Sequence, residues 1–110
     1  MTEFAEKPYG TTGAEINIKT DKGENAGSVI VTEKGKRVKI GNVHVNKDFR
    51  GLKFGEKLLG AAEEWAAGRN FHEIYGMLTP VPGGERALLE ALQKRGYEVN
   101  FKTGIVKKKI

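Results

Sequence analysis

The sequence contains no cysteine, two histidines and no long run of apolar residues. The absence of cysteine excludes a disulfide, a thiolate nucleophile and a thiolate metal site, and His44 and His72 alone do not favour a zinc centre. The opening residues, Met-Thr-Glu-Phe-Ala-Glu, are acidic, with neither the basic start of a signal peptide nor the apolar stretch of a membrane span. We therefore expect a soluble cytoplasmic protein with no resident metal.

The charge balance of the chain is basic, with 19 Lys and Arg residues, 14 Asp and Glu residues and a formal net charge of +5. A chain of 110 residues forms one domain with a core of its own. The positive charge suits an anionic partner, either a nucleic acid or a polyphosphate cofactor. A solvated lysine-rich surface explains the same composition, so charge alone does not decide between these readings.

The stretch around Gly41 predicts a strand with an irregularity. Val38 and Ile40 occupy even positions, whereas Val43 and Val45 occupy odd ones. A regular strand cannot place all four side chains on one face, because successive side chains alternate between the two faces. One extra residue near Gly41 and Asn42 restores the phase. This is the pattern of a β-bulge, a feature often found beside a functional site.

A basic, glycine-containing turn follows this strand and leads directly into a helix. Its residues include Arg50, Gly51, Lys53 and Gly55, and Lys57 follows one turn later. The first amides of a helix have no intrahelical partner, so they can bind a phosphate together with the macrodipole and the nearby cations. The spacing matches neither of the common nucleotide-binding glycine motifs, and such turns often have only a structural role. The helical period itself consists of Phe54, Leu58, Ala61, Ala62, Trp65 and Ala66.

The remaining hydrophobic patterns predict a mixed set of strands and one further helix. Short turns connect the first strands, which favours an antiparallel meander, and a strand, helix and strand in succession imply a parallel pair. Residues 1–13 show no clear period, so we expect an irregular N-terminal segment. The other predicted elements are strands at 15–20, 28–32 and 73–79, a helix at 85–95 and a C-terminal hairpin of 97–101 with 105–110.

The residues Val45-Asn46-Lys47-Asp48-Phe49-Arg50-Gly51-Leu52-Lys53-Phe54-Gly55 resemble the acyl-CoA-binding segment of the GNAT superfamily of N-acetyltransferases. The family pattern there is Val-x-Pro-x-x-Arg-Gly-x-Gly-x-Gly or Ala. This sequence departs from it at Lys47, where Pro is frequent, and at Lys53, which replaces the middle glycine. The resemblance continues through Gly96-Tyr97.

The resemblance implies an α+β fold of the GNAT type, with an antiparallel meander, a bulged central strand, a parallel strand-helix-strand pair and two helices. Residues 14–110 would form this acyl-CoA-binding domain. The family usually has helices after its first strand, and these are missing here. The N-terminal part is therefore reduced, which implies an unusually open acceptor site and favours a macromolecular amine as the acceptor.

The same resemblance implies acetyl-CoA as the co-substrate. In the family, backbone groups of the bulged strand hold the pantetheine arm and polarise the thioester carbonyl, and the matching positions are Val43 and Val45. The glycine turn would hold the pyrophosphate. Its matching residues are Arg50, Gly51, Leu52, Lys53, Phe54, Gly55, Glu56 and Lys57.

The side chains that usually donate or accept protons in the family are absent from the matching positions of this sequence. The tyrosine that often protonates the leaving thiolate corresponds to Leu92, and no Glu lies on the bulged strand. His44 is the only side chain on that strand with a suitable ordinary pKa, so it is the candidate base. Tyr97, and also Tyr75, are candidate replacement acids, although packing explains each of them as well.

Three functions remain open at this stage. The first is an N-acetyltransferase in which an amine attacks the thioester of acetyl-CoA directly. The second is a GNAT-like domain without turnover that binds CoA or a protein partner, which the leucine at position 92 favours. The third is a small basic nucleic-acid-binding domain, but the chain lacks the interleaved aromatic residues typical of that class.

Overall fold

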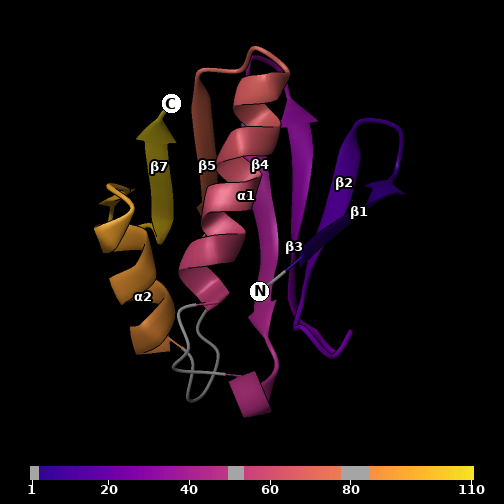
Figure 1. The fold of residues 1–110 in the computed structure, drawn as a ribbon. Helices are drawn as coiled ribbons and strands as arrows, with labels where there is room; N and C mark the ends of the chain where they lie inside the picture. Colours follow the sequence, from indigo (N-terminus) through magenta and orange to yellow (C-terminus); the bar gives the residue numbers. More distant parts are fainter. Residues whose placement is uncertain (1–2, 50–53, 78–84) are drawn as a thin grey trace.

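The computed structural model describes residues 3–49, 54–77 and 85–110, which form one seven-stranded sheet and two α-helices (Figure 1). The order of strands across the sheet is β1-β2-β3-β4-β5-β7-β6. The elements are β1 (Glu3–Tyr9), β2 (Gly13–Lys19), β3 (Asn25–Lys34), β4 (Arg37–Val45), a 3-10 turn (Lys47–Phe49), α1 (Phe54–Gly68), β5 (Glu73–Met77), α2 (Glu85–Lys94), β6 (Glu98–Val99) and β7 (Ile105–Lys109).

The pairing of the strands confirms the predicted mixed sheet. Strands β1 to β4 form an antiparallel meander, and β4 pairs in parallel with β5 after the crossover through α1. Strand β7 then pairs antiparallel with both β5 and β6. The fold is therefore α+β with a single parallel strand pair among the described residues, and that pair includes the strand for which the sequence predicts a bulge.

The prediction of an irregular segment over residues 1–13 is wrong. Residues Glu3–Tyr9 form β1, and β2 already begins at Gly13, so the N-terminal residues belong to the same sheet as the rest. All seven residues of β1 are exposed, and an exposed strand leaves no hydrophobic alternation in the sequence. The strand is held instead by pairing with β2 and by a hydrogen bond from the Trp65 indole to Glu6, 2.8 Å long.

The predicted bulge in β4 is confirmed by the register of β3 and β4. Ile30 pairs with Gly41 and Ser28 pairs with His44, so two steps along β3 correspond to three along β4. The extra residue brings Val43 and Val45 to the same face of the sheet as Val38 and Ile40. Val45 consequently pairs with Gly27, at which an added Cβ would lie 3.2 Å from the side chain of Leu58 in α1.

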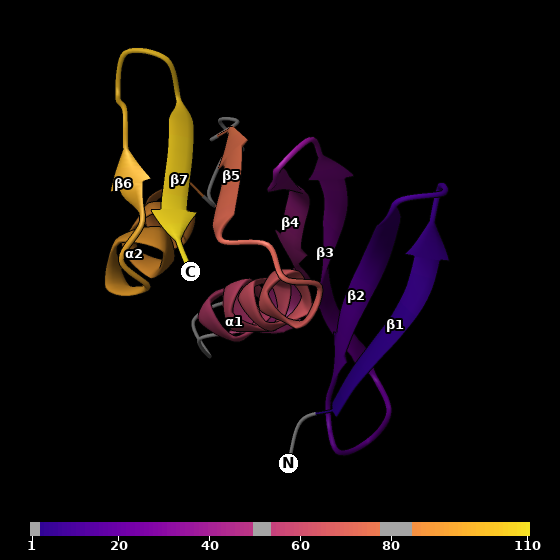
Figure 2. The same ribbon diagram turned by 90° about the horizontal axis from the view of Figure 1, so that it is seen from above.

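The core lies between one face of the sheet and the two helices. Figure 2 shows α1 and α2 on the same, concave side of the sheet, where they contact each other. In the part of the chain that the structure describes, no helix covers the opposite face. The largest fully buried side chains are Ile18, Val29, Val31, Val38, Leu58, Leu59 and Ile74. Neither described helix has the length and apolarity needed to cross a membrane.

Candidate functional site

The bulge in β4 directly follows the stretch of β4 that pairs in parallel with the described part of β5. Among the described residues, that pairing covers Val38 to Ile40 on β4 and Ile74 to Gly76 on β5. Gly76 lies so close to β4 that an added Cβ would be 2.9 Å from the Ile40 carbonyl oxygen. The bulge follows this tight contact, so Val43 lies directly after the described pairing of β4 with β5.

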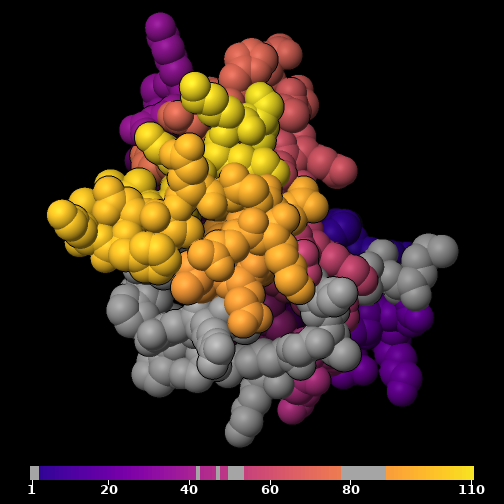
Figure 3. Space-filling model, turned by 90° about the vertical axis from the view of Figure 1, so that its left-hand side faces the viewer, coloured from indigo at the N-terminus to yellow at the C-terminus, as the bar shows by residue number. Residues whose placement is uncertain are grey.

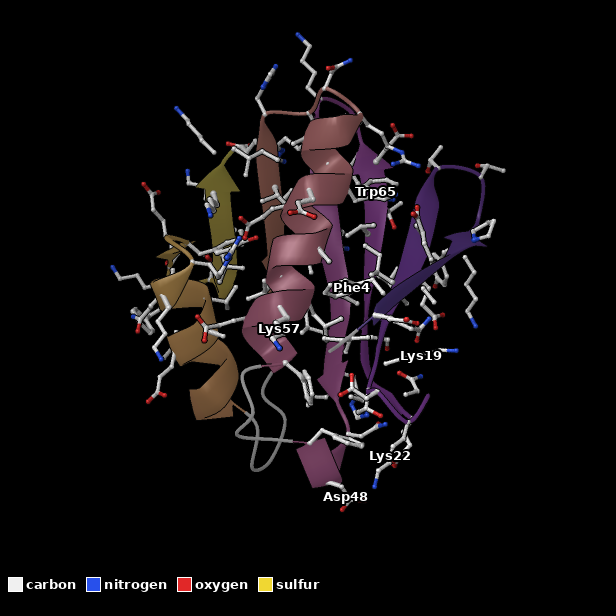
Figure 4. The ribbon with its side chains drawn as sticks, viewed as in Figure 1. Phe4, Lys19, Lys22, Asp48, Lys57 and Trp65 are labelled. Carbon is white, nitrogen blue, oxygen red and sulfur yellow. The ribbon has the colours of Figure 1, made fainter. Side chains whose placement is uncertain are left out.

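The start of α1 lies at the same end of the sheet as the bulge. Phe54, the first residue of α1, is 7% exposed and packs edge-on against Phe49 of the 3-10 turn, with ring centroids 5.9 Å apart. Gly55 and Glu56 are half-buried, and Lys57 is exposed on the first turn (Figure 4). Anchoring Phe54 fixes where the unpaired amides of the first turn point. Of the other predicted pyrophosphate residues, Arg50, Gly51, Leu52 and Lys53 lie outside the described residues.

The three predicted residues on β4 differ in their exposure to solvent, because successive side chains of a strand alternate between the two faces of the sheet. Val43 and Val45 are half-buried and pack against the core, as the sequence predicts for the core face. His44 is exposed, and its Nε2 lies 3.0 Å from Oδ1 of Asn46. The main-chain N–H of Asn46 donates to the Ala26 carbonyl, 2.8 Å away, which ties the end of β4 to the start of β3.

Tyr97 lies in the core rather than at the bulge. It is 5% exposed, and its hydroxyl donates to Glu63 Oε2 over 3.2 Å. Burial, together with the adjacent negative charge of Glu63, raises the pKa of the Tyr97 phenol above its ordinary value. Tyr97 directly precedes β6, and two strands of the sheet separate β6 from β4. This placement counts against the predicted role of Tyr97 as an acid for the leaving thiolate.

Leu92 and Tyr75, the other two positions considered for proton transfer, pack against other residues of the fold. Leu92 in α2 is 3% exposed and belongs to the hydrophobic core. Tyr75 is half-buried on β5, and the Arg37 guanidinium lies over its ring, 4.1 Å from the centroid. Arg37 also pairs with Glu73 at 3.4 Å. Among the described residues, His44 is thus the predicted proton-handling group that is both at the bulge and exposed.

Sequence reasoning missed the buried carboxylate of Glu63. Glu63 is 8% exposed and accepts from Arg95 at 2.9 and 3.2 Å, from Lys108 at 2.8 Å and from Tyr97. Burial alone raises the pKa of this carboxyl, but the hydrogen bonds from Arg95 and Lys108 outweigh it and hold the pKa below its ordinary value. A signal exists in the sequence, because Glu63 stands four residues after Leu59 and three before Ala66, which places it on a buried face of α1.

Glu63, Arg95, Tyr97 and Lys108 form a cluster, the Glu63 cluster, that joins α1 to the C-terminal part of the chain. Arg95 follows α2 and Lys108 lies on β7, so the carboxylate connects three elements that are distant in sequence. Figure 3 shows α2 and the β6–β7 hairpin side by side on this flank of the molecule. The cluster is structural, and it fixes the position of α2 against α1.

Comparison with known proteins agrees with this geometry. No curated protein matches the chain. Among solved structures, a GNAT family acetyltransferase from Elizabethkingia anophelis with acetyl-CoA bound aligns with a TM-score of 0.78 at 13% identity, covering 99% of this chain and 98% of that one. An IAA acetyltransferase from Bacillus cereus aligns with a TM-score of 0.74 at 19% identity, covering 90% and 79%.

The ribosomal-protein-S18-alanine N-acetyltransferase from Escherichia coli aligns with a TM-score of 0.73 at 14% identity, covering 93% of this chain and 72% of that one. At these identities the solved structures show a shared fold. The sequence model of the acetyltransferase (GNAT) family matches residues 3–98, which includes the bulged strand, α1 and α2. The chain therefore belongs to the GNAT family of acetyltransferases.

Proposed function

We propose that this protein is an N-acetyltransferase that transfers an acetyl group from acetyl-CoA to an amine by direct attack on the thioester. The observation that carries the proposal is the bulge in β4, located just past the described β4–β5 pairing and at the same end of the sheet as the start of α1. Family membership supports the reaction class. The Elizabethkingia structure, which contains acetyl-CoA, supports the choice of co-substrate.

In this proposal, the cofactor binds mainly to backbone groups. The pantetheine arm lies along β4, and the main chain at Val43 and Val45 orients the thioester and polarises its carbonyl. The pyrophosphate binds at the start of α1, over residues 50–57, where the helix dipole and free amides favour an anion. Lys57 contributes a further positive charge, but it is exposed, so its contribution is small.

The thiolate leaves without a general acid on α2. Leu92 occupies the position at which the family often carries a tyrosine, and its buried hydrocarbon cannot supply a proton. The thiolate therefore leaves unprotonated or takes a proton from water. General acid catalysis typically contributes about 10² to 10⁴-fold, so we expect slow turnover compared with a family member that has the tyrosine.

The acceptor in this proposal is an amine on a macromolecule. In the described part of the chain, β1 and β2 are joined by a short turn, and no helix lies on the sheet face that carries His44. A large substrate can approach such a face without displacing another element. The Escherichia coli neighbour is named as an enzyme that acetylates an alanine of ribosomal protein S18, which supports a protein acceptor for this fold.

A second candidate function is a CoA-binding domain without turnover. The buried Leu92 favours it, because the usual acid is replaced by a core residue. Both functions require the same cofactor site. Detection of acetylated product separates them.

The first experiment measures thermal unfolding with acetyl-CoA and with desulfo-CoA, followed by mass detection of acetylation over a panel of proteins and small amines. A ligand at a hundredfold excess over its dissociation constant stabilises the folded state by about 2.7 kcal/mol. Product on proteins supports the transferase, and binding without any product supports the second function. If neither ligand shifts the melting temperature at millimolar concentration, the cofactor assignment is wrong.

A further inference from the structure

A chain of polar side chains connects β2, β3 and β4 beside the bulge. Asn17, Ser28 and His44 are successive partners across these strands, so they lie in one row on the sheet face opposite α1. Asn25 and Asn46 bridge this row at the start of β3 and just after β4. The bridging contacts are Asn25 Nδ2 to Asn17 Oδ1 at 3.3 Å, Asn46 Nδ2 to the Asn25 carbonyl, and His44 Nε2 to Asn46 Oδ1 at 3.0 Å.

Backbone groups determine which way both bridging amides point. The Gly27 N–H donates to Asn25 Oδ1 at 3.2 Å, so the NH₂ group of Asn25 faces Asn17. The Asn25 carbonyl can only accept, so the NH₂ group of Asn46 must face it. Turning the Asn46 amide over would place its oxygen against a carbonyl oxygen and its NH₂ group against His44. The backbone therefore directs Asn46 Oδ1 toward the imidazole.

The direction of the last hydrogen bond decides where the imidazole proton lies. Asn46 Oδ1 can only accept, so His44 Nε2 must carry the hydrogen in this contact. In a neutral imidazole the other ring nitrogen then has a free lone pair. Nδ1 of His44 is accordingly the atom available to accept a proton. An ordinary exposed histidine on a strand would have no partner that selects one tautomer.

We propose that Asn46 is the positioning residue of His44, the candidate base on β4: it holds Nε2 protonated and leaves Nδ1 to accept the proton of the acceptor amine. This inference rests on the proposed function. His44 lies between Val43 and Val45, the positions assigned to the thioester, and no described helix covers its face of the sheet. An acceptor that approaches from that face can therefore reach the exposed imidazole.

The proton and electron balance of the step is simple. The acceptor ammonium gives one proton to Nδ1 of His44 and becomes a neutral amine. Its lone pair forms the new C–N bond at the thioester carbonyl carbon, and the C–S bond breaks with its electron pair on sulfur. The amide nitrogen releases its second proton to water. The imidazolium returns its proton to solvent, and the neutral ring is restored.

The assignment of the ring proton is tested by nitrogen-15 NMR of the imidazole rings, which is independent of activity. The chain has only two histidines, so their signals are separable with a His72→Ala variant. We expect neutral His44 to be protonated at Nε2 in the wild type. The Nδ1-protonated form should appear in Asn46→Ala and be reduced in Asn46→Gln, which keeps both an accepting oxygen and an NH₂ group. Protonation at Nδ1 in the wild type would overturn the assignment.

The catalytic role is tested by acetylation rates with the protein substrate that the wild type modifies. We expect His44→Ala to lower the rate by about 10²-fold or more, with partial rescue by added imidazole, and Asn46→Ala to lower it about fivefold. His72→Ala is the matched control. His72 is exposed and precedes β5, at the end of the parallel pair opposite the bulge, so its loss should leave the rate unchanged.

Rates and acetyl-CoA binding together distinguish an error in the general base from an error in the proposed function. An unchanged rate in His44→Ala, with acetyl-CoA binding intact, rejects the general base while the acetyltransferase stands. A wild-type protein that binds no acetyl-CoA rejects the proposed function and the base together. Melting temperatures of the Asn46 variants show whether they fold, and Asn46→Gln serves if Asn46→Ala does not.

Discussion

Gly55 occupies the second position of α1, where, among the described residues, an added Cβ would meet only the Cβ of Ala91, 4.0 Å away. The described part of the fold therefore has room for a side chain at this position. Alanine is also the better helix former, by roughly 0.5–1 kcal/mol. Packing therefore does not explain why this position is glycine, and close approach of a ligand to the backbone would explain it.

We predict that Gly55→Ala keeps or slightly raises the stability of the protein and weakens acetyl-CoA binding about tenfold, or ~1.4 kcal/mol. The methyl group would enter the space in which the phosphate meets the helix amides. Calorimetric titration with acetyl-CoA measures the affinity, and urea unfolding measures the stability. Gly68→Ala, at the other end of α1 with no atom near the added Cβ, is the control and should bind normally. Equal affinities in the two variants would contradict binding by the backbone.

Glu63 stabilises the fold through its three partners, and we predict that Glu63→Leu lowers the free energy of unfolding by about 2 kcal/mol. This is below the ~3–5 kcal/mol for breaking a fully buried pair, because the Arg95 and Lys108 side chains are 37% and 23% exposed and can be hydrated. Urea unfolding measures the change. Glu64→Leu, at the exposed neighbouring position, should have little effect, and equal losses in both variants would show that the cluster contributes nothing specific.

At the scale of elements, β1 is an edge strand that few side chains attach to the rest of the fold. None of its side chains is buried, and it pairs only with β2. Its contact with α1 comes from Glu6, which accepts from the Trp65 indole and lies 3.8 Å from Arg69. The Arg69 guanidinium also stacks on the Trp65 ring at 4.0 Å. Figure 4 shows Trp65 on the side of α1 that faces these strands.

We predict that Glu6→Leu makes the amides of β1 exchange with solvent several-fold faster, because the indole hydrogen bond contributes about 1 kcal/mol to the local stability of the strand. Amides in β3 and β4 should keep their protection. Hydrogen exchange followed by mass spectrometry resolves the two regions. Lys7→Leu is the control, because the ion pair that Lys7 makes among the described residues, with Glu15 at 3.6 Å, is exposed on the Lys7 side. Faster exchange throughout the sheet would instead mean that β1 unfolds together with the core.

For the molecule as a whole, the Glu63 cluster determines how stability depends on pH. The folded-state pKa of Glu63 lies below its ordinary value of 4.5, so its stabilisation is fully present above that value and is lost as the pH falls below it. The folded-state pKa of Tyr97 lies above its ordinary value of 10.0. Its stabilisation is therefore present below that value and is lost as the pH rises above it.

We predict two separable losses of stability, one acidic and one alkaline, measured by urea unfolding across the pH range. Glu63→Gln should flatten the acidic arm, and Tyr97→Phe should flatten the alkaline arm. Near neutral pH the wild type should be more stable than either variant, since Tyr97→Phe also removes the hydrogen bond to Glu63. Curves for the variants that run parallel to the wild type at both extremes would show that other groups control the titration.

Several features of this protein follow from its sequence alone because they are local. The change of parity between Ile40 and Val43 is enough to predict the bulge, since side chains alternate strictly along a strand. The hydrophobic period from Phe54 predicts α1, which begins at that residue. The run from Val45 to Gly55 resembles the acyl-CoA segment of the family to which the chain belongs. Each of these predictions depends only on residues that lie close together in the sequence.

The tertiary structure alone decided the contacts between residues that are distant in the sequence. β1 has no buried residue, so no hydrophobic pattern reveals it, and its link to Trp65 spans 59 residues. Glu63 reaches partners 32 to 45 residues away, and Asn46 reaches the Asn25 carbonyl across 21. Periodicity records which side chains are buried, but a polar group's partner depends on which elements pack together, and that depends on the whole fold.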